Sequence, residues 1–464
     1  MHVILDSSEL GELDAVETAK RIDTGELKAS EAVAAAIERA RALNAALNAI
    51  PTETYRAALA RAEQPEPGPF SGVPTFVKGL DDVRGEVNDL GSRALVDHVA
   101  RRTEPYVAHM LGTGLVSLGR SAAPEIGLSA TTEPLAHGPT RNPWNVGHST
   151  GGSSGGAAAL VASRVVPLAH ASDAGGSIRI PASSCGLVGL KPSRARGFSS
   201  VLADLLPVRV FTYGAVTRTV RDTAHFVAAM ETRIGPRKLP PIGLIEGPSP
   251  QRLRIGLYTD SPLGGEVHPE VRATTLAAGR SCAALGHEVE EIACPFDGRT
   301  LDDFWVYIGF LAFALIQQTR MTLRRRFEAE RFEPWTRGLA AHFKANWRES
   351  AGTLRRLRST RRVSADLFRD FDAVLCPTLS APAPKIGDFA PDKPFDAVLP
   401  LQKRHMCFTP FQNASGDPAI SLPLGVTRDG LPIGVQLAAG PGGDARLLSL
   451  AYELEGSGAF KTLG

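Results

Sequence analysis

The sequence predicts an α/β fold, and two observations carry this prediction. From about residue 104 to 205, helix-like segments alternate with apolar strand-like pieces such as VVPLAHAS and with turns rich in glycine, serine and proline. Beyond residue 250, the segments LRIGLY, HPEVRATTLAAGRSCAALG and HEVEEI indicate a strand, a helix and a strand. Because the same layering continues past residue 250, we expect no separate C-terminal module.

Residues 1–65 are predicted to form an N-terminal helical layer. Apolar residues recur at helical spacing in SEAVAAAIERARALNAALNAI, and Ser30 stands where an N-cap is expected. The segment EQPEPGPFSGVP then ends the helical pattern with four prolines and two glycines. The β-favouring TFVKGL follows, so Lys78 is expected on a short strand.

Residues 302–370 are predicted to be mainly helical and to form a variable cap, before residues 371–464 complete the core. The apolar stretch from Trp305 to Ile316 has two interpretations. It covers a pocket for a hydrophobic substrate, or it is ordinary core packing. The sequence leaves both open.

Composition excludes several functional classes. The chain has 464 residues, a formal net charge of +2 and 22% charged residues, so it has no general attraction for nucleic acid or for membranes. Its five cysteines are widely spaced without metal-ligand motifs, which predicts reduced thiols and neither a disulfide framework nor a zinc site. The N-terminal segment lacks a leader pattern, and no apolar run approaches ~20 residues. We expect a cytoplasmic protein without metal or cofactor.

The run STGGSSGG, residues 149–156, is compatible with a tether, a phosphate loop or the scaffold of a catalytic serine. It continues directly into the helix-favouring AAALVAS, which argues against a tether, and it lacks the lysine of a P-loop. It also matches G-x-S-x-G, but that motif requires a strand directly before it, and no strand is expected there. The nucleophile is therefore expected elsewhere.

Ser177, in HASDAGGSIRIPASSCGLVGLKP, is the stronger nucleophile candidate. Gly175 and Gly176 before it allow the backbone to turn, so that successive N–H groups converge on one point. Such a cluster of donors is what an oxyanion hole requires. The segment SIRIP after the glycines is interpreted as strand-like.

A serine nucleophile needs a base, and Lys78 is the best candidate. It follows apolar residues on a strand that is expected to be buried, and burial lowers the pKa of a lysine until it can accept a serine proton. Lys191 is a rival by proximity in the sequence. Because Pro192 and the turn-like KPSRARG surround it, we expect Lys191 in a loop.

Four segments together resemble the amidase signature family, whose members hydrolyse C–N amide bonds: GVPTFVKGLDDV, GPTRNPWNVGHSTGGSSGG, ASDAGGSIRIPASSCGLVGLKPS and TPFQNASGDPAISLPLGV. The resemblance covers about residues 70–205 and 370–455. It implies a single amidase domain over residues 1–464, with a signature core at 70–205. It also implies a central mixed β-sheet flanked by helices in an α/β/α arrangement.

The resemblance also implies roles for individual residues. Ser177 corresponds to the acylated nucleophile, Lys78 to the general base, and Ser153 to a bridging serine that follows a cis peptide bond. The other positions carried over fall into two groups: the backbone N–H groups of an oxyanion hole at Ala174, Gly175, Gly176 and Ser177, and side chains that support the loop at Asp173, Arg179 and Ser154.

Two further segments, EIGLSATTEPLAHGPTRNPW and HASDAGGSIRIPAS, look closest to stand-alone bacterial amidases. Such enzymes act on aryl amides, on aminohexanoate oligomers or, as urethanases, on carbamates. The resemblance therefore implies a small-molecule amide or carbamate substrate and a monomer or homodimer. Two alternatives stay open: the amidase subunit of a tRNA-dependent amidotransferase, and a catalytically silent scaffold.

Overall fold

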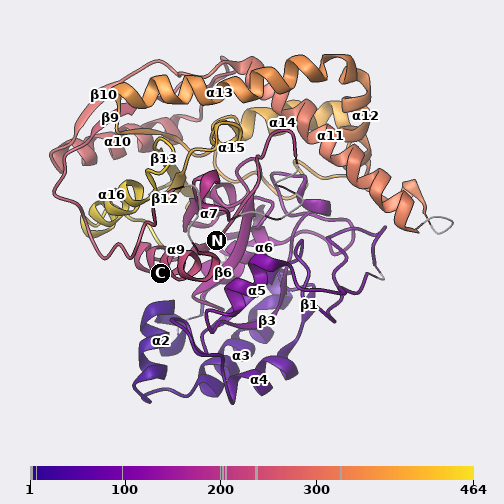
Figure 1. Ribbon diagram of the computed structural model, residues 1–464, viewed down its shortest axis with the longest axis vertical. Helices are drawn as coiled ribbons and strands as arrows, with labels where there is room; N and C mark the ends of the chain where they lie inside the picture. Colours follow the sequence, from indigo (N-terminus) through magenta and orange to yellow (C-terminus); the bar gives the residue numbers. More distant parts are fainter. Residues whose placement is uncertain are drawn as a thin grey trace.

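An eight-stranded mixed sheet organises the part of the chain that the structure describes (Figure 1). This computed structural model describes residues 4–6, 8–96, 98–198, 200, 203, 206–235, 239–323 and 327–463. The predicted α/β fold is confirmed. The strand order is β10-β9-β11-β13-β12-β7-β8-β6; the three strands β10, β9 and β11 are parallel, and every other neighbouring pair is antiparallel. The strands are β6 (Leu168–Asp173), β7 (Val188–Lys191), β8 (Thr212–Thr217), β9 (Arg254–Leu257), β10 (Glu288–Glu291), β11 (Ala373–Pro377), β12 (Ala419–Val426) and β13 (Pro432–Ala438).

A smaller sheet extends the edge that β6 forms. It has the order β1 (Thr52–Glu53), β3 (Val116–Ser121) and β2 (Pro74–Lys78). The hydroxyl of Thr75 in β2 donates to the carbonyl of Leu168 in β6 at 3.1 Å, so β2 runs beside β6. Lys78 is thus the last residue of a fully buried strand, which confirms its predicted position.

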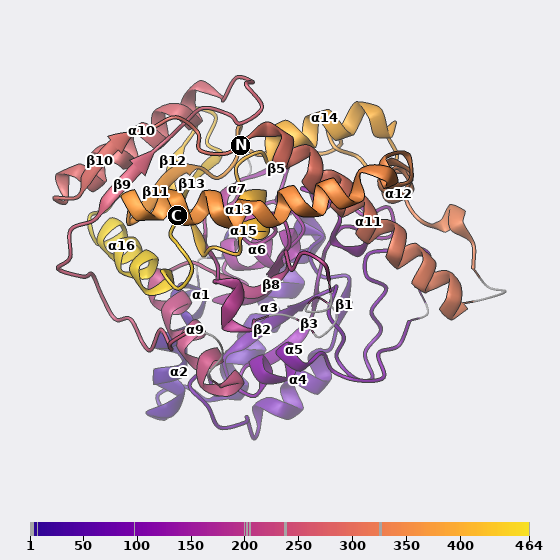
Figure 2. The ribbon, with the colours of Figure 1, turned by 45° about the horizontal axis from the view of Figure 1, so that its top comes forward.

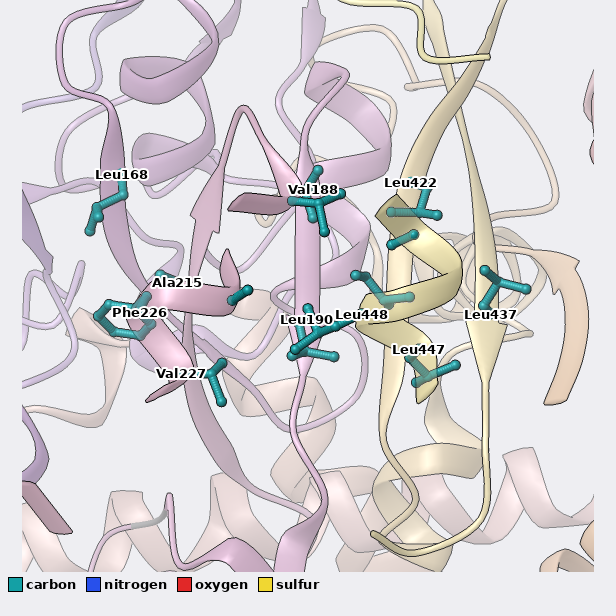
Figure 3. Packing of buried hydrophobic residues seen from close by; sticks show 14 of the residues in the cluster. Leu168, Val188, Leu190, Ala215, Phe226, Val227, Leu422, Leu437, Leu447 and Leu448 are labelled. Carbon is teal, nitrogen blue, oxygen red and sulfur yellow. The ribbon is translucent and has the colours of Figure 1, made fainter. Parts of the chain in front are cut away.

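Period-two alternation buries both faces of the large sheet. Leu168, Val188 and Leu437 lie on one face, under α9 (Val220–Ile234) and α16 (Asp444–Gly456) (Figure 3). Their neighbours Ala169 and Val216 face the other way and pack with α3 (Ala29–Leu47), α6 (Gly155–Ala162) and α7 (Arg179–Cys185). Each fully buried leucine contributes about 2 kcal/mol of transfer free energy, so this sandwich holds the loops at the strand ends in place.

The N-terminal helices cover the small sheet, at the bottom of Figure 1. The prediction that Ser30 caps the helix at 29–47 is wrong, because Lys28 is the N-cap of α3 and Ser30 lies in its first turn. The Lys28 backbone N–H donates to the Glu31 carboxylate at 3.0 Å, which is the contact that an acidic residue three positions after the N-cap provides.

The predicted cap region is mainly helical where the structure describes it, and positions 324–326 of that region lie outside the described residues. Figure 2 shows α13 (Ser350–Asp370) crossing the front and α11 (Gly298–Leu323) extending to one side. Trp305 of α11 meets Trp335 of α12 (Pro334–Asn346) edge to face, with ring centroids 5.9 Å apart. By length and composition alone, the stretch Gly298–Met321 is long and apolar enough to cross a membrane. However, 56% of its apolar part is buried inside the protein.

The remaining elements connect these layers. They are α1 (Glu9–Glu12), α2 (Ala15–Asp23), α4 (Tyr55–Ala62), α5 (Pro105–Leu111), η1 (Glu125–Gly127), β4 (Arg141–Asn142), β5 (Asn145–Ser149), η2 (Arg194–Arg196), α10 (Pro269–Ala284), η4 (Ala329–Arg331), η5 (Trp347–Glu349), α14 (Phe395–His405) and α15 (Pro410–Ser415).

Candidate active site

The Lys78 side chain is fully buried and is surrounded by serine oxygens. Its Nζ lies 2.8 Å from Ser153 Oγ, 3.0 Å from Ser172 Oγ and 3.4 Å from the Ser172 carbonyl. Burial lowers the pKa of Lys78 to about 7, although Asp81 and Asp173 act in the opposite direction. A neutral amine has two N–H donors and one lone pair. Because a carbonyl can only accept, the Ser172 carbonyl takes a donor, and the lone pair is free to accept from a serine hydroxyl.

The loop that carries Ser153 is held against two neighbouring segments. The peptide bond between Gly152 and Ser153 is cis, as the family resemblance implies. A side-chain carbon at Gly152 would lie 2.7 Å from the Thr131 carbonyl, so only glycine fits there. The Ser154 hydroxyl donates to the Ser172 carbonyl at 3.3 Å, which ties the loop to β6 beside Lys78.

A strand does precede this loop, so the expectation that none would is wrong. β5 ends at Ser149 and pairs with β4 in a two-stranded ribbon that is separate from the large sheet. The sequence RNPWNVGH does not predict these two strands, because proline, asparagine and glycine have low β-propensity. The ribbon leads into the cis peptide and not into a strand-to-helix elbow of the central sheet.

Ser177 lies on the connection between β6 and α7. Its side chain is half-buried, whereas Lys78 and Ser153 are buried. The interpretation of SIRIP as a strand is wrong, because α7 begins at Arg179. Pro181 falls in the first turn of this helix, where its missing N–H costs nothing. The connection therefore presents Ser177 just before the N-terminus of a helix.

The oxyanion-hole candidates differ in how their N–H groups are used. Gly176 adopts a φ of 130° and donates its N–H to the Asp173 carboxylate at 2.7 Å, so that group is already occupied. Among the described contacts, the N–H groups of Ala174, Gly175 and Ser177 have no hydrogen-bond acceptor. The Thr409 hydroxyl donates to the Gly175 carbonyl at 2.6 Å and so fixes the direction of the next peptide. Three donors, and not four, stay available.

Asp173 and Arg179 form a buried ion pair beneath this connection. The Arg179 Nε and Nη2 atoms each lie 3.0 Å from a carboxylate oxygen of Asp173. Burial alone would raise the pKa of Asp173, but the guanidinium beside it holds that pKa at about 2. The pair is therefore charged at neutral pH and supports the turn that carries Ser177, without any atom exposed for chemistry.

Sequence reasoning missed three partners of Arg179. Its guanidinium also donates to side-chain oxygens of Gln412, Gln436 and Asn413 at 3.1, 2.7 and 2.6 Å. The first and last lie in TPFQNASGDP, one of the segments that resemble the amidase signature family. A buried hydrogen bond of Gln436 could have been predicted, since a lone amide in the middle of the apolar strand PIGVQLA needs a buried partner.

Lys191 is not in a loop, contrary to expectation. It is the last residue of β7 and pairs with Ala419 of β12. Burial, followed by the charge of Arg179, lowers the pKa of Lys191 to about 7. Its Nζ donates to the Pro192 carbonyl at 3.0 Å, and the structure records no hydrogen bond from it to a serine among the described residues. Contact with a serine hydroxyl, and not burial, distinguishes the two lysines.

Apolar groups of the cap lie beside the Ser177 loop. A side-chain carbon at Gly175 would lie 2.7 Å from the ring of Phe304 in α11 and 3.3 Å from the Met406 methyl group. Leu128 and Ala174 are half-buried members of the same apolar cluster. A cavity of about 510 Å³ between η2 and α9 contains none of these residues. Phe304 of the cap and Met406 therefore lie against the Ser177 loop, whereas that cavity does not contact it.

The chain is similar to known proteins over nearly its whole length. Residues 31–448 match the family model described as Amidase. AmiC of Mycobacterium tuberculosis, an amidase by its name, is 43% identical over 458 residues, which cover 98% of this chain and 96% of AmiC. The 6-aminohexanoate-cyclic-dimer hydrolase of a Pseudomonas species is 34% identical, covering 96% of this chain and 94% of the hydrolase. A solved structure of a 6-aminohexanoate cyclic dimer hydrolase superposes with a TM-score of 0.90 at 32% identity, covering 97% of this chain and 98% of the other.

Proposed function

This chain belongs to the amidase signature family and is an amide-cleaving hydrolase, and from that premise we propose that it hydrolyses small amides through Ser177, Ser153 and Lys78. The observation that carries the proposal is the 2.8 Å contact between Lys78 Nζ and Ser153 Oγ in a buried site. A buried lysine whose pKa is near 7 can accept a proton at neutral pH. The serine in contact with it can transfer a proton from a second serine to this lysine.

The proposed reaction begins with acylation of Ser177. Neutral Lys78 accepts the Ser153 hydroxyl proton as Ser153 accepts the proton of Ser177, whose Oγ forms a bond to the amide carbonyl carbon. The carbonyl oxygen becomes an oxyanion, which the N–H groups of Ala174, Gly175 and Ser177 stabilise. The C–N bond then breaks, and the leaving amine takes the proton back from Lys78 through Ser153.

Deacylation reverses these proton transfers. Water gives a proton through Ser153 to Lys78, and its oxygen forms a bond to the ester carbon of the acyl-enzyme. The bond between that carbon and Ser177 Oγ then breaks, Lys78 returns the proton through Ser153 to Ser177 Oγ, and the acid leaves. No step consumes a cofactor. Carbamates and esters present the same carbonyl carbon, so the site is expected to accept them as well.

The proposed substrates are hydrophobic on the side that meets the cap. Phe304 and Met406 support this, because their side chains lie beside Gly175 in the Ser177 loop. Apolar ligand surface that packs against these side chains contributes about 25 cal/mol of binding free energy for each Å² removed from water. Aryl amides and uncharged aminohexanoate oligomers fit this requirement.

We further propose that the protein works in the cytoplasm as a monomer or homodimer that needs no other subunit. The cysteines support a reducing compartment, since Cys185, Cys282, Cys294, Cys376 and Cys407 are all free thiols.

Turnover of a substrate panel by the purified protein tests the proposal. The panel contains an anilide, a fatty amide, an aminohexanoate oligomer, an aryl carbamate and an ester, and Ser177→Ala is the control for background hydrolysis. We expect turnover of at least one apolar amide that the control lacks. Failure of the folded protein on every amide would favour the silent scaffold, and amide hydrolysis that needs an added partner would favour the amidotransferase subunit.

A further inference from the structure

A buried carboxylate, Asp81, follows the proposed base three positions later in the chain. Asp81 follows Lys78 through a tight turn, in which the Asp81 N–H donates to the Lys78 carbonyl at 3.2 Å. The Asp81 side chain is buried, and its Oδ1 accepts the Tyr213 hydroxyl at 2.6 Å. Its Oδ2 has no hydrogen-bond donor among the described residues. A buried carboxylate that is only half satisfied needs a counter-charge nearby.

Neither His170 nor Arg120 donates a charged hydrogen bond to the Asp81 carboxylate among the described contacts. The His170 Nδ1 is 3.9 Å from Asp81 Oδ2, but it accepts the Lys78 backbone N–H at 3.3 Å and so carries no proton. Burial lowers the pKa of His170 to about 3, which keeps the ring neutral. The Arg120 guanidinium reaches only the Asp81 backbone carbonyl, and its charge is paired with Glu86 at 3.0 Å.

The other titratable groups around Asp81 add no positive charge. Tyr213 lies on β8 and stacks on Tyr106 of α5, with ring centroids 4.4 Å apart. Glu104, at the N-cap of α5, and Asp82, next in the chain, are both acidic. Burial raises the pKa of Asp81 to about 6, while the Tyr213 hydrogen bond and then Lys78 oppose the rise.

Two carboxylates act on Lys78, and they differ in one respect. Both carboxylate oxygens of Asp173 accept hydrogen bonds from one edge of the Arg179 guanidinium, so most of its charge is already compensated. Asp81 has no such side-chain cation bonded to it among the described residues. In agreement with this, Asp81 is the larger of the two influences that favour a charged Lys78.

We propose that Asp81, held by Tyr213, is a positioning residue for the base: its negative charge stabilises Lys78 while the amine holds the proton taken from the serines. The inference rests on the proposed role of Lys78 in catalysis. The proton passes from Ser177 to Ser153 and from Ser153 to Lys78, which is then a buried cation until the leaving amine takes the proton. Without Asp81 the amine is a weaker base and the protonated intermediate state is less stable.

The pH dependence of labelling by a fluorophosphonate probe tests this role without knowledge of the substrate. We would measure the second-order rate of Ser177 labelling from about pH 5 to about pH 9. Only neutral Lys78 can act as the base, so the wild-type rate falls as the pH drops below the lysine pKa. Asp81→Asn removes the charge that favours protonation. The acidic limb of the curve of labelling rate against pH, where the rate falls as the pH decreases, should therefore move to lower pH by about one unit or more. The constant rate reached at higher pH, the plateau, should also fall.

Two further variants make the result specific. Asp82→Asn removes a charge from the next residue, whose carboxylate contacts Asn88 and His98, and it should move the limb far less than Asp81→Asn does. Tyr213→Phe removes only the hydrogen bond to Asp81, which eases protonation of Asp81. Its limb should shift in the same direction as that of Asp81→Asn, but less. This variant decides the matter if Asp81→Asn does not fold.

A folded Asp81→Asn with an unmoved limb overturns the inference, and so does an equal shift in Asp82→Asn. Either result leaves the proposed amidase mechanism intact, because the wild type still labels with an acidic limb. Wild-type protein that does not react with the probe at any pH would instead overturn the proposed function, and the role of Asp81 with it.

Discussion

Lys78 Nζ lies 2.8 Å from Ser153 Oγ, and the two residues come from segments 75 positions apart that meet where both side chains are buried. The lysine ends a strand, and the serine follows a cis peptide bond before a helix. A buried amine in contact with a hydroxyl can accept a proton at neutral pH. A lysine exposed to water would be protonated at this pH, and the same contact could then not accept a proton.

Lys78→Met is expected to lower kcat for an apolar anilide by roughly 10⁴-fold, because methionine keeps the volume and loses the base. Lys191→Met is the matched control, since Lys191 is equally buried but contacts the Pro192 carbonyl and no serine among the described residues. Steady-state kinetics on both folded variants make the measurement. Substantial turnover by Lys78→Met at neutral pH would contradict the assignment of the base.

Arg179→Met should lower the free energy of unfolding by about 3–5 kcal/mol, because it leaves the buried Asp173 carboxylate without its counter-charge. Arg369→Met is the comparison. Arg369 pairs with Asp366 at the surface, so its loss should change stability by less than about 0.5 kcal/mol. Urea denaturation followed by circular dichroism compares the two. Similar small losses in both variants would show that the buried pair does not support the fold.

Phe304→Ala should change substrate preference more than it changes chemistry. Removing the ring beside Gly175 opens space next to the Ser177 loop, so the ratio of kcat/KM for a bulky aryl amide over a small one should rise. Phe313→Ala, further along α11 against Phe343, should leave that ratio unchanged. If the two variants shift the ratio equally, Phe304 does not bound the substrate site.

Much of the fold could be predicted because its signals are local. Alternation of apolar segments and turns predicted the α/β class, and the apolar neighbours of Lys78 predicted a buried strand. The predicted division into one domain with a cap, including its boundaries, stays a prediction. Oligomeric state and compartment also stay predictions.

The errors arose where tertiary contacts decide the local structure. Lys191 lies next to a proline and a turn, yet pairing with β12 keeps it in a strand. Arg179 begins a helix because Asp173 accepts the N–H groups of Gly176 and Ile178 and turns the chain after the strand. The partners of Arg179 on α15 and β13 lie more than 230 positions away in sequence, and no local pattern connects them.

The central claim is that Ser177 forms the covalent bond while Ser153 only relays a proton. Mass spectrometry of peptides from protein treated with a fluorophosphonate probe tests it most directly, with Ser153→Ala and Ser177→Ala treated in parallel. We predict a single adduct on Ser177 in the wild type, the same adduct formed far more slowly in Ser153→Ala, and none in Ser177→Ala. An adduct on Ser153 in the wild type, or full-rate labelling of Ser153→Ala, would contradict the account.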